Sequence, residues 1–194
     1  MWSRDVADWI LQYAHERTGT DSISNMQLQK LVFLAESCFG SLYGTSLVNE
    51  PIQAWEHGPA IKPMYGQFKC NGKGPIPTPE TKVSVPEAVA EVLESVWDNF
   101  GHLSASDLRN LTHDMGPYSA HYVPQVKDIE IPKGEIHEAW SDFLTAGSRV
   151  SRRLSPSERS RMLDLLGDGR STIAPDTGYN ADQIRADYHA FART

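Results

Sequence analysis

Apolar residues recur at helical spacing in several stretches of the sequence, and most of these stretches are bounded by residues that start or stop helices. The clearest stripe runs through the segment that opens at Ser24 or Asn25 and ends at Gly44. Its apolar positions are Leu28, Leu31, Val32, Ala35, Cys38, Phe39 and Leu42. The spacing is that of a buried helix face, and the width of the stripe predicts a helix at the centre of the fold.

Further helices are predicted on both sides of this central segment. Ser3 is placed to cap a first helix that runs to about Arg17, and Gly19 is placed to stop it. A short helix over residues 61–69 is expected to face the core with Ile61, Tyr65 and Phe68. The remaining predicted helical segments are residues 86–100, residues 104–111, a short piece near Tyr118 and residues 136–144.

Three stretches lack helical periodicity. Pro51 and the pair Gly58-Pro59 punctuate residues 47–59, which predicts an extended or irregular segment. Six Gly and Pro residues between positions 71 and 86 indicate an exposed loop. Ile129 and Ile131 alternate with polar neighbours, as in a short edge strand. The fold is therefore expected to be mainly α, a compact helical domain with a minor β element.

The last fifty residues differ from the rest in charge. Residues 1–144 hold ten basic and 19 acidic side chains, a net charge of −9, whereas residues 145–194 hold eight Arg and six acidic side chains, a net charge of +2. We therefore divide the chain into a domain over residues 1–146 and an Arg-rich extension over residues 147–194. A helix start at residues 155–158 predicts that the extension is a C-terminal helical appendage.

Length and composition narrow the class of protein. A chain of 194 residues can bury a core without disulfides or metals. The overall net charge of −7 argues against wholesale disorder and against a nucleic-acid-binding coat. Its two cysteines, Cys38 and Cys70, provide no disulfide framework and fit a reducing compartment. With no signal peptide or membrane span in the pattern, we expect a cytoplasmic protein with no membrane partner.

The sequence matches known catalytic motifs only in part. His137-Glu138 opens an HExxH zinc motif, but Ser141 stands where the second histidine must be. A looser group consists of His57, His113, Asp114 and His121, which would form a metal or acid/base site if the fold gathered them. The alternative is that these side chains cap helix ends and form hydrogen bonds. We favour that alternative and expect no enzymatic activity and no metal.

A group of arginines marks the extension. Its members are Arg149, Arg152, Arg153, Arg159 and Arg161. Arginines bind phosphates or an acidic partner, but they also form solvated helix faces or pair with an acidic part of the same chain. The segment is short, has no interleaved aromatic residues and belongs to an acidic chain. These features favour a protein contact or a solvated face over nucleic acid.

Three short motifs occur in a fixed order along the chain. They are N-M-Q-L-Q-K-L at residues 25–31, I-Q-A-W-E-H-G-P at residues 52–59 with Tyr65 following, and L-S-A from residue 103 with Leu108, Leu111, Thr112-His113-Asp114 and Pro117-Tyr118. They are similar to the N-M-K-L-Q-K-L, I-x-A-W-x-x-G-P and L-S-x-x-x-L-x-x-x-T-H blocks of the Panacea domain. The chain thus resembles, over about residues 3–145, the SocA-like antitoxin family that is often labelled phage-associated.

This resemblance implies a mostly helical antitoxin that binds and neutralises a cognate protein toxin encoded beside it, without a small-molecule cofactor. Different members of the family are paired with unrelated toxins, so the resemblance does not identify the toxin. In the SocA type, the antitoxin also resembles an adaptor that delivers the toxin to a ClpXP-type protease. Two alternative functions stay open: an enzyme that uses the histidine group, and a DNA-binding autoregulator.

The candidate toxin-binding residues come from the motifs and from the extension. They are Gln29, Lys30, Trp55, Glu56, His57, His113, Tyr118, Arg149, Arg152, Arg153, Arg159 and Arg161. The extension is the leading candidate for partner-specific contact. Trp55 is either an anchor for a partner or a core residue that locks its segment onto the helices. Gln29 and Lys30 either share a polar patch with other candidates or satisfy buried backbone groups of the irregular segment.

Overall fold

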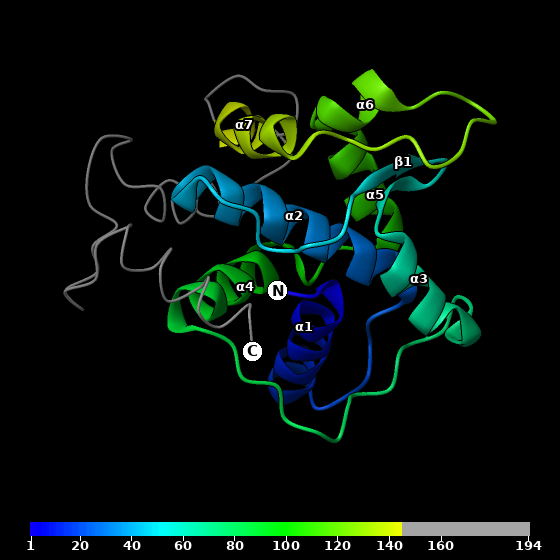
Figure 1. The fold of residues 1–194 in the computed structure, drawn as a ribbon. Coiled ribbons are helices and arrows are strands. Elements are labelled where there is room, and N and C mark those ends of the chain that lie inside the picture. The colour runs from blue at the N-terminus through cyan, green and yellow to red at the C-terminus, as the bar shows by residue number, and fades with distance from the viewer. Residues whose placement is uncertain (145–194) are drawn as a thin grey trace.

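One long helix, α2 (Asn25–Tyr43), runs through the middle of the structure, and the other elements pack around it (Figure 1). The computed structural model describes residues 1–144. In chain order, the other elements are α1 (Ser3–Thr18), β1 (Gln53–Trp55), β2 (Gly58–Ala60), α3 (Lys62–Phe68), the 3-10 turn η1 (Lys69–Asn71), α4 (Glu87–Phe100), α5 (Ala105–Asp114), α6 (Pro117–His121) and α7 (Lys133–Leu144). The predicted mainly α fold with a minor β element is confirmed.

The central helix begins and ends as the sequence predicts. The backbone N–H of Gln27 donates to the Ser24 hydroxyl, while Gln27 Oε1 accepts from the Ser24 N–H at 3.0 Å, which forms a capping box. At the other end, Gly44 adopts a left-handed φ of 63°, a conformation that glycine takes without steric cost. Every residue from Leu28 to Gly40 is buried. The predicted stripe is thus correctly placed, but the helix is covered on all sides.

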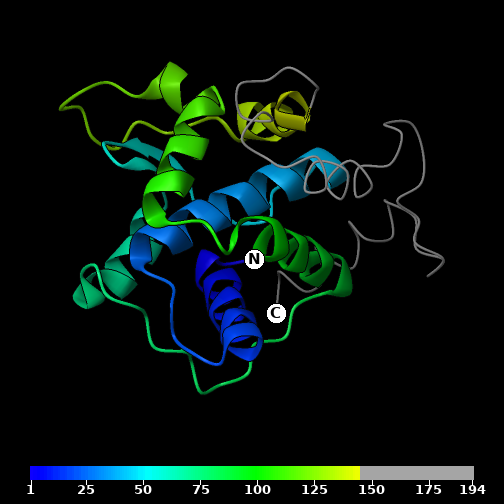
Figure 2. The same cartoon turned by 180° about the vertical axis from the view of Figure 1, so that it is seen from behind.

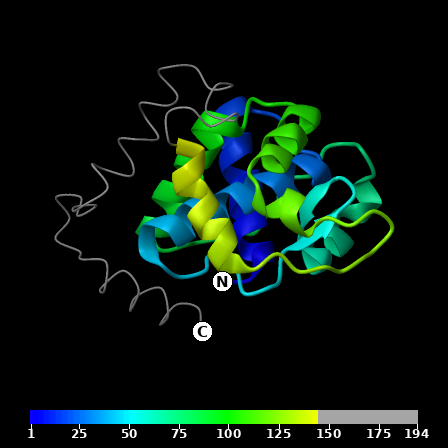
Figure 3. The same cartoon turned by 90° about the horizontal axis from the view of Figure 1, so that it is seen from above.

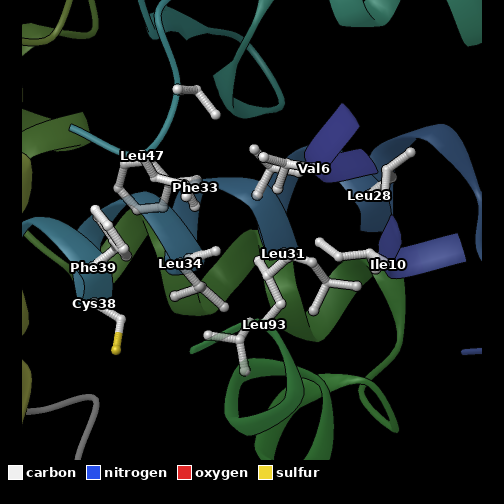
Figure 4. Close-up of a cluster of buried hydrophobic side chains, with 14 of the residues drawn as sticks. Val6, Ile10, Leu28, Leu31, Phe33, Leu34, Cys38, Phe39, Leu47 and Leu93 are labelled. Carbon is white, nitrogen blue, oxygen red and sulfur yellow. The ribbon is translucent and has the colours of Figure 1, made fainter. Parts of the chain in front are cut away.

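Helices pack on both sides of α2. α7 crosses over it on one side, as Figure 3 shows, while α1 and α4 lie on the other side and α5 crosses its N-terminal part (Figures 1 and 2). Leu31 and Leu34 of α2 meet apolar side chains from α1 and α4 in the core (Figure 4). Burial of one such side chain contributes about 1.5–3 kcal/mol. This packing fixes the positions from which α2 projects its polar side chains.

Two buried polar side chains of α2 fix neighbouring backbone on the side of α7. Glu36 Oε2 accepts a hydrogen bond from the Val48 N–H at 2.9 Å, and Glu36 Oε1 lies 2.9 Å from His137 Nε2. Lys133 donates to the Val48 carbonyl and places its ammonium 3.8 Å from the same carboxylate. The Ser37 hydroxyl donates to the Ile136 carbonyl at 2.6 Å. The buried charge of Glu36 is therefore compensated, and α7 is set in register on α2.

Two details of the predicted helices are wrong. Ser3 does not cap α1. It is the first helical residue, and the Glu50 carboxylate instead accepts hydrogen bonds from its N–H at 2.9 Å and from its hydroxyl at 2.6 Å. Tyr65 does not face the core, because Met64 occupies the buried position of α3 and Tyr65 is 42% exposed. The cap comes from a distant residue, which local sequence patterns do not reveal.

The non-helical segments are more firmly held than the pattern indicates. Within the predicted exposed loop, Ile76 is buried, and Gln12 of α1 ties the loop down by donating to the carbonyls of Pro79 and Thr81 and accepting from the Val83 N–H. The predicted edge strand near residue 130 is a single antiparallel bridge between Gln53 and Glu130. Glycine and proline content therefore predicted irregular backbone correctly, but not its attachment.

The predicted domain boundary at residue 146 and the helical extension predicted after it lie outside the described residues. No helix among residues 1–144 combines the length and the apolar character that crossing a bilayer requires.

We predict that Gly40→Ala destabilises the fold. A β-carbon at residue 40 would overlap the ring of His137, which packs against bare backbone of α2. Overpacking of this kind costs about 1–3 kcal/mol of unfolding free energy, measurable by urea denaturation. Gly66→Ala is the matched control, because that helical position has open space around it and should be neutral or slightly stabilising. Equal stabilities of the two variants would contradict the packing described.

Candidate functional site

A small β-hairpin carries the second sequence motif. β1 and β2 are antiparallel, with Gln53 opposite Ala60 and Trp55 opposite Gly58. The two turn residues, Glu56 and His57, are exposed. Gly58 follows the turn with φ at +96°, a conformation that side-chain-bearing residues rarely adopt. The irregular segment predicted from the sequence is therefore a tight hairpin whose turn points into solvent.

The central helix holds β2 from behind. Lys30 Nζ donates to the Pro59 carbonyl at 2.7 Å, and Gln29 Oε1 accepts from the Ile61 N–H at 2.7 Å. The side chains of Gln29 and Lys30 are buried, with 3% and 2% of each residue exposed. One of the two alternatives for these residues is thus confirmed: they satisfy buried backbone groups. We refer to Gln29, Lys30 and Tyr118 together as the hairpin clamp.

Tyr118 completes the clamp from α6. Its hydroxyl donates to the Trp55 carbonyl at 2.9 Å, just before the turn. Its ring stacks on the ring of His113, with centroids 4.0 Å apart, and on Tyr122, with centroids 5.3 Å apart. The hairpin is therefore fixed on one side by α2 and at its turn by α5 and α6. Burial raises the pKa of Tyr118 to about 12, so its hydroxyl keeps its proton at neutral pH.

The interior of this site favours uncharged forms of its basic groups. Burial, reinforced by the positive charge of Arg109, lowers the pKa of Lys30 to about 7. Burial also lowers the pKa of His113 to about 4, and Arg109 and Lys30 act in the same direction. His113 Nε2 is buried and has no hydrogen-bond partner among the described residues. His113 is consequently a neutral imidazole at pH 7.

The outer side of the hairpin carries aromatic and apolar groups. The indole of Trp55 meets the ring of Tyr65 edge to face, with centroids 5.2 Å apart. The segment between α6 and α7 returns alongside β1 (Figure 1), and Lys62 ties it to α3 through a 2.9 Å bond to Asp128. We call the outward-facing group the hairpin surface, formed by Trp55, Glu56, His57 and Tyr65.

The structure brings most predicted site residues together but not all of them. Gln29, Lys30, Trp55, Glu56, His57, His113 and Tyr118 all lie at the hairpin. Trp55 is half-buried against Tyr65, so it is neither a core residue nor fully exposed. The arginines at positions 149, 152, 153, 159 and 161 lie outside the described residues.

The alternative histidine site is not assembled. His121 lies against Glu135, with Nε2 2.8 Å from the carboxylate, rather than against His113. Within residues 1–144, no group of three or more His, Cys, Asp or Glu side chains could hold a metal ion. Sequence reasoning missed Arg109, which lies one helical turn before His113 and whose positive charge acts on Lys30 and His113. That spacing was the available signal.

Comparison with known proteins assigns the region that contains this site. The family described as Antitoxin SocA-like, Panacea domain, matches residues 28–118. The protein "Antitoxin SocA" of Caulobacter vibrioides (strain NA1000 / CB15N) is 34% identical over 106 residues, which cover 48% of this chain and 56% of that protein. The chain thus spans about half the length of that curated relative. No solved structure matches. The part of the chain that matches the SocA-like Panacea domain, residues 28–118, includes the hairpin and its clamp.

We predict that Lys30→Met changes how stability depends on pH. The unfolded chain binds a proton at Lys30 up to about pH 10, whereas the folded chain releases it near pH 7. Stability of the unsubstituted chain should therefore rise with pH between about 7 and 10, and the variant should lack this part of the rise. Urea unfolding at pH 7.5 and 9.5 should show the difference between the two proteins shifting by about 1–2 kcal/mol in favour of lysine. Parallel pH profiles would contradict a buried, unpaired ammonium.

Proposed function

We propose that this chain is an antitoxin that neutralises a protein toxin by binding it directly through the hairpin surface. The observation that carries the proposal is the family match over residues 28–118, because that range contains the hairpin and the clamp that fixes it. The toxin is the product of a reading frame beside the gene of this chain, as the family resemblance implies. Inhibition then requires occupation of the toxin surface and no chemical reaction.

Exposure and rigidity at the hairpin support this proposal. Four large hydrophobic side chains are exposed among the described residues, and one of them, Tyr65, belongs to the hairpin surface. Aromatic anchors such as Tyr65, which packs edge to face on Trp55, are typical of protein interfaces. The clamp fixes the hairpin backbone before a partner arrives, which lowers the entropy lost on binding.

The extension has a complementary role in the proposal. Its Arg149, Arg152 and Arg153 contact the toxin and supply partner specificity, since unrelated toxins cannot all be recognised by the same rigid hairpin alone. Replacement of these three arginines by Gln in the full chain separates this contribution from that of the hairpin. A chain that still binds the toxin at full strength would remove the extension from the proposal.

Delivery of the toxin to a ClpXP-type protease is a further part of the proposed function. Direct inhibition and delivery differ in what they require. Direct inhibition occurs with the two purified proteins alone, whereas delivery shortens the half-life of the toxin only in cells that contain the protease. Toxin half-life measured with and without that protease decides whether delivery takes place.

We predict that the double variant Glu56→Arg, Tyr65→Ala binds the toxin at least tenfold more weakly, because it removes an aromatic anchor and reverses a charge on the hairpin surface. The measurement is calorimetric titration of the neighbouring gene product with the full chain, together with a growth assay on co-expression. Glu91→Arg on α4 is the matched control. Glu91 is exposed on a helix away from the hairpin and lies near Glu87 and Glu94, so its reversal should be harmless. Equal affinities for the double variant and the control would contradict binding through the hairpin.

A further inference from the structure

The longest stretch of the chain without an acidic residue begins at the hairpin turn and covers residues 57–79. Three of the ten basic side chains of residues 1–144 lie in it, namely Lys62, Lys69 and Lys73, and none of the 19 acidic ones does. The stretch therefore carries a charge of +3 within a part of the chain whose net charge is −9. Such a local reversal of charge marks a surface that is complementary to a particular partner.

Helix α3 and the 3-10 turn after it place these lysines at the outer edge of the molecule, next to the hairpin (Figure 1). Met64 and Phe68 turn toward the core, so the opposite face of α3 is open to solvent. Helical spacing puts an aromatic ring and two lysines on that face, and the third lysine follows just after η1. We call this face the α3 surface, formed by Lys62, Tyr65, Gly66, Lys69 and Lys73, all of which are exposed.

Tyr65 joins the α3 surface to the hairpin surface. It is 42% exposed, and its ring meets the indole of Trp55 edge to face. Lys62 is engaged by Asp128 at 2.9 Å, whereas Lys69 and Lys73 form no ion pair with any residue between 1 and 144. The α3 surface thus continues the hairpin surface and adds two ammonium groups that are available to a partner.

Gly66 leaves bare backbone in the middle of the α3 surface. Glycine weakens the interior of an exposed helix relative to alanine. A β-carbon at this position would have open space around it, and its φ does not lie in the left-handed region. Neither packing nor backbone conformation in the described part of the chain therefore requires a glycine here. A partner that approaches the helix backbone closely would require one.

The surrounding charges favour an acidic protein segment as the occupant. Ammonium groups bind carboxylates and phosphates alike, so an acidic segment and a nucleic acid share the necessary chemistry. The exposed Glu56 on the hairpin turn and the net charge of −9 on residues 1–144 repel a polyanion that continues beyond α3. A short acidic strip on a folded protein ends before it meets those charges.

We propose that the α3 surface binds an acidic segment of the toxin. Tyr65 packs in the contact, Lys69 and Lys73 pair with carboxylates, and the partner approaches the backbone at Gly66. The proposal rests on the proposed antitoxin function and deepens it by naming the chemistry of the toxin surface. Because Glu56 and the lysines of α3 carry opposite charges, they also fix the orientation in which the toxin docks.

Calorimetric titration of the neighbouring gene product with full-length variants tests the lysines. The double variant Lys69→Glu, Lys73→Glu should bind at least tenfold more weakly at low salt, and the loss should shrink in high salt. Lys82→Glu is the matched control, because it reverses an exposed lysine in the loop before α4 and should bind almost normally. In a double-mutant cycle, an Asp→Asn or Glu→Gln variant of the toxin should be non-additive with Lys69→Glu. Equal affinities for the double variant and the control would overturn the proposal.

A steric wedge at Gly66 tests the close approach without changing any charge. Gly66→Phe should bind the toxin at least tenfold more weakly than Gly66→Ala, because its ring would stand between α3 and the partner. Both variants should unfold at similar urea concentrations, since the space around this position is open. Full-strength toxin binding by Gly66→Phe would show that the α3 surface stays uncovered in the complex and would also overturn the proposal.

The remaining outcomes separate this proposal from its alternatives. A labelled single-stranded RNA at physiological salt should bind neither the unsubstituted chain nor the lysine variant. RNA binding that requires Lys69 and Lys73, together with toxin binding that does not, would assign the surface to nucleic acid and overturn the proposal. Toxin binding that is insensitive to the α3 variants would leave the antitoxin function standing without this contact. If the unsubstituted chain binds no toxin, the proposed function itself is refuted, and the proposal falls with it.

Discussion

Four polar side chains that α2 carries into the core hold the hairpin segment, the segment after α2 and helix α7 in place. Gln29 binds the Ile61 N–H, Lys30 the Pro59 carbonyl, Glu36 the Val48 N–H and Ser37 the Ile136 carbonyl. A buried polar group without a partner costs about 1–3 kcal/mol. Breaking any of these hydrogen bonds would leave a polar side chain and a polar backbone group unsatisfied in the core. The four bonds therefore help to specify the fold.

The same constraint prepares the hairpin for a partner. With β2 held by α2 and the turn held by Tyr118, the strands have little freedom left, and only the outward side chains can adapt. A rigid backbone with an exposed turn suits a domain that inhibits by contact. The cost of this rigidity is concentrated at Lys30, whose ammonium is buried beside Arg109 without an acidic partner among the described residues.

Local patterns in the sequence were sufficient for the helices and insufficient for the site. The apolar stripe, the start at Ser24 or Asn25 and the end at Gly44 predicted α2, since these signals depend on neighbours within one or two turns. The bonds from Gln29 and Lys30 join residues about thirty positions apart, and no spacing rule reveals them. Tyr65 was assigned to the core because it is aromatic at a helical position, yet Met64 occupies the buried position and Tyr65 packs at the edge of Trp55. Several residues of the family motifs, namely Gln29, Lys30 and Tyr118, support the backbone of the hairpin.

Hydrogen exchange of the Ile61 backbone amide in the free chain tests the central claim most directly. This N–H donates to the buried Gln29 side chain at 2.7 Å, outside any helix or strand ladder. If α2 fixes the hairpin before any partner binds, the Ile61 amide exchanges almost as slowly as the core amides of α2, such as Leu34, close to the limit of global unfolding. Exchange orders of magnitude faster than at Leu34 would show that the hairpin detaches from the central helix and would contradict the account.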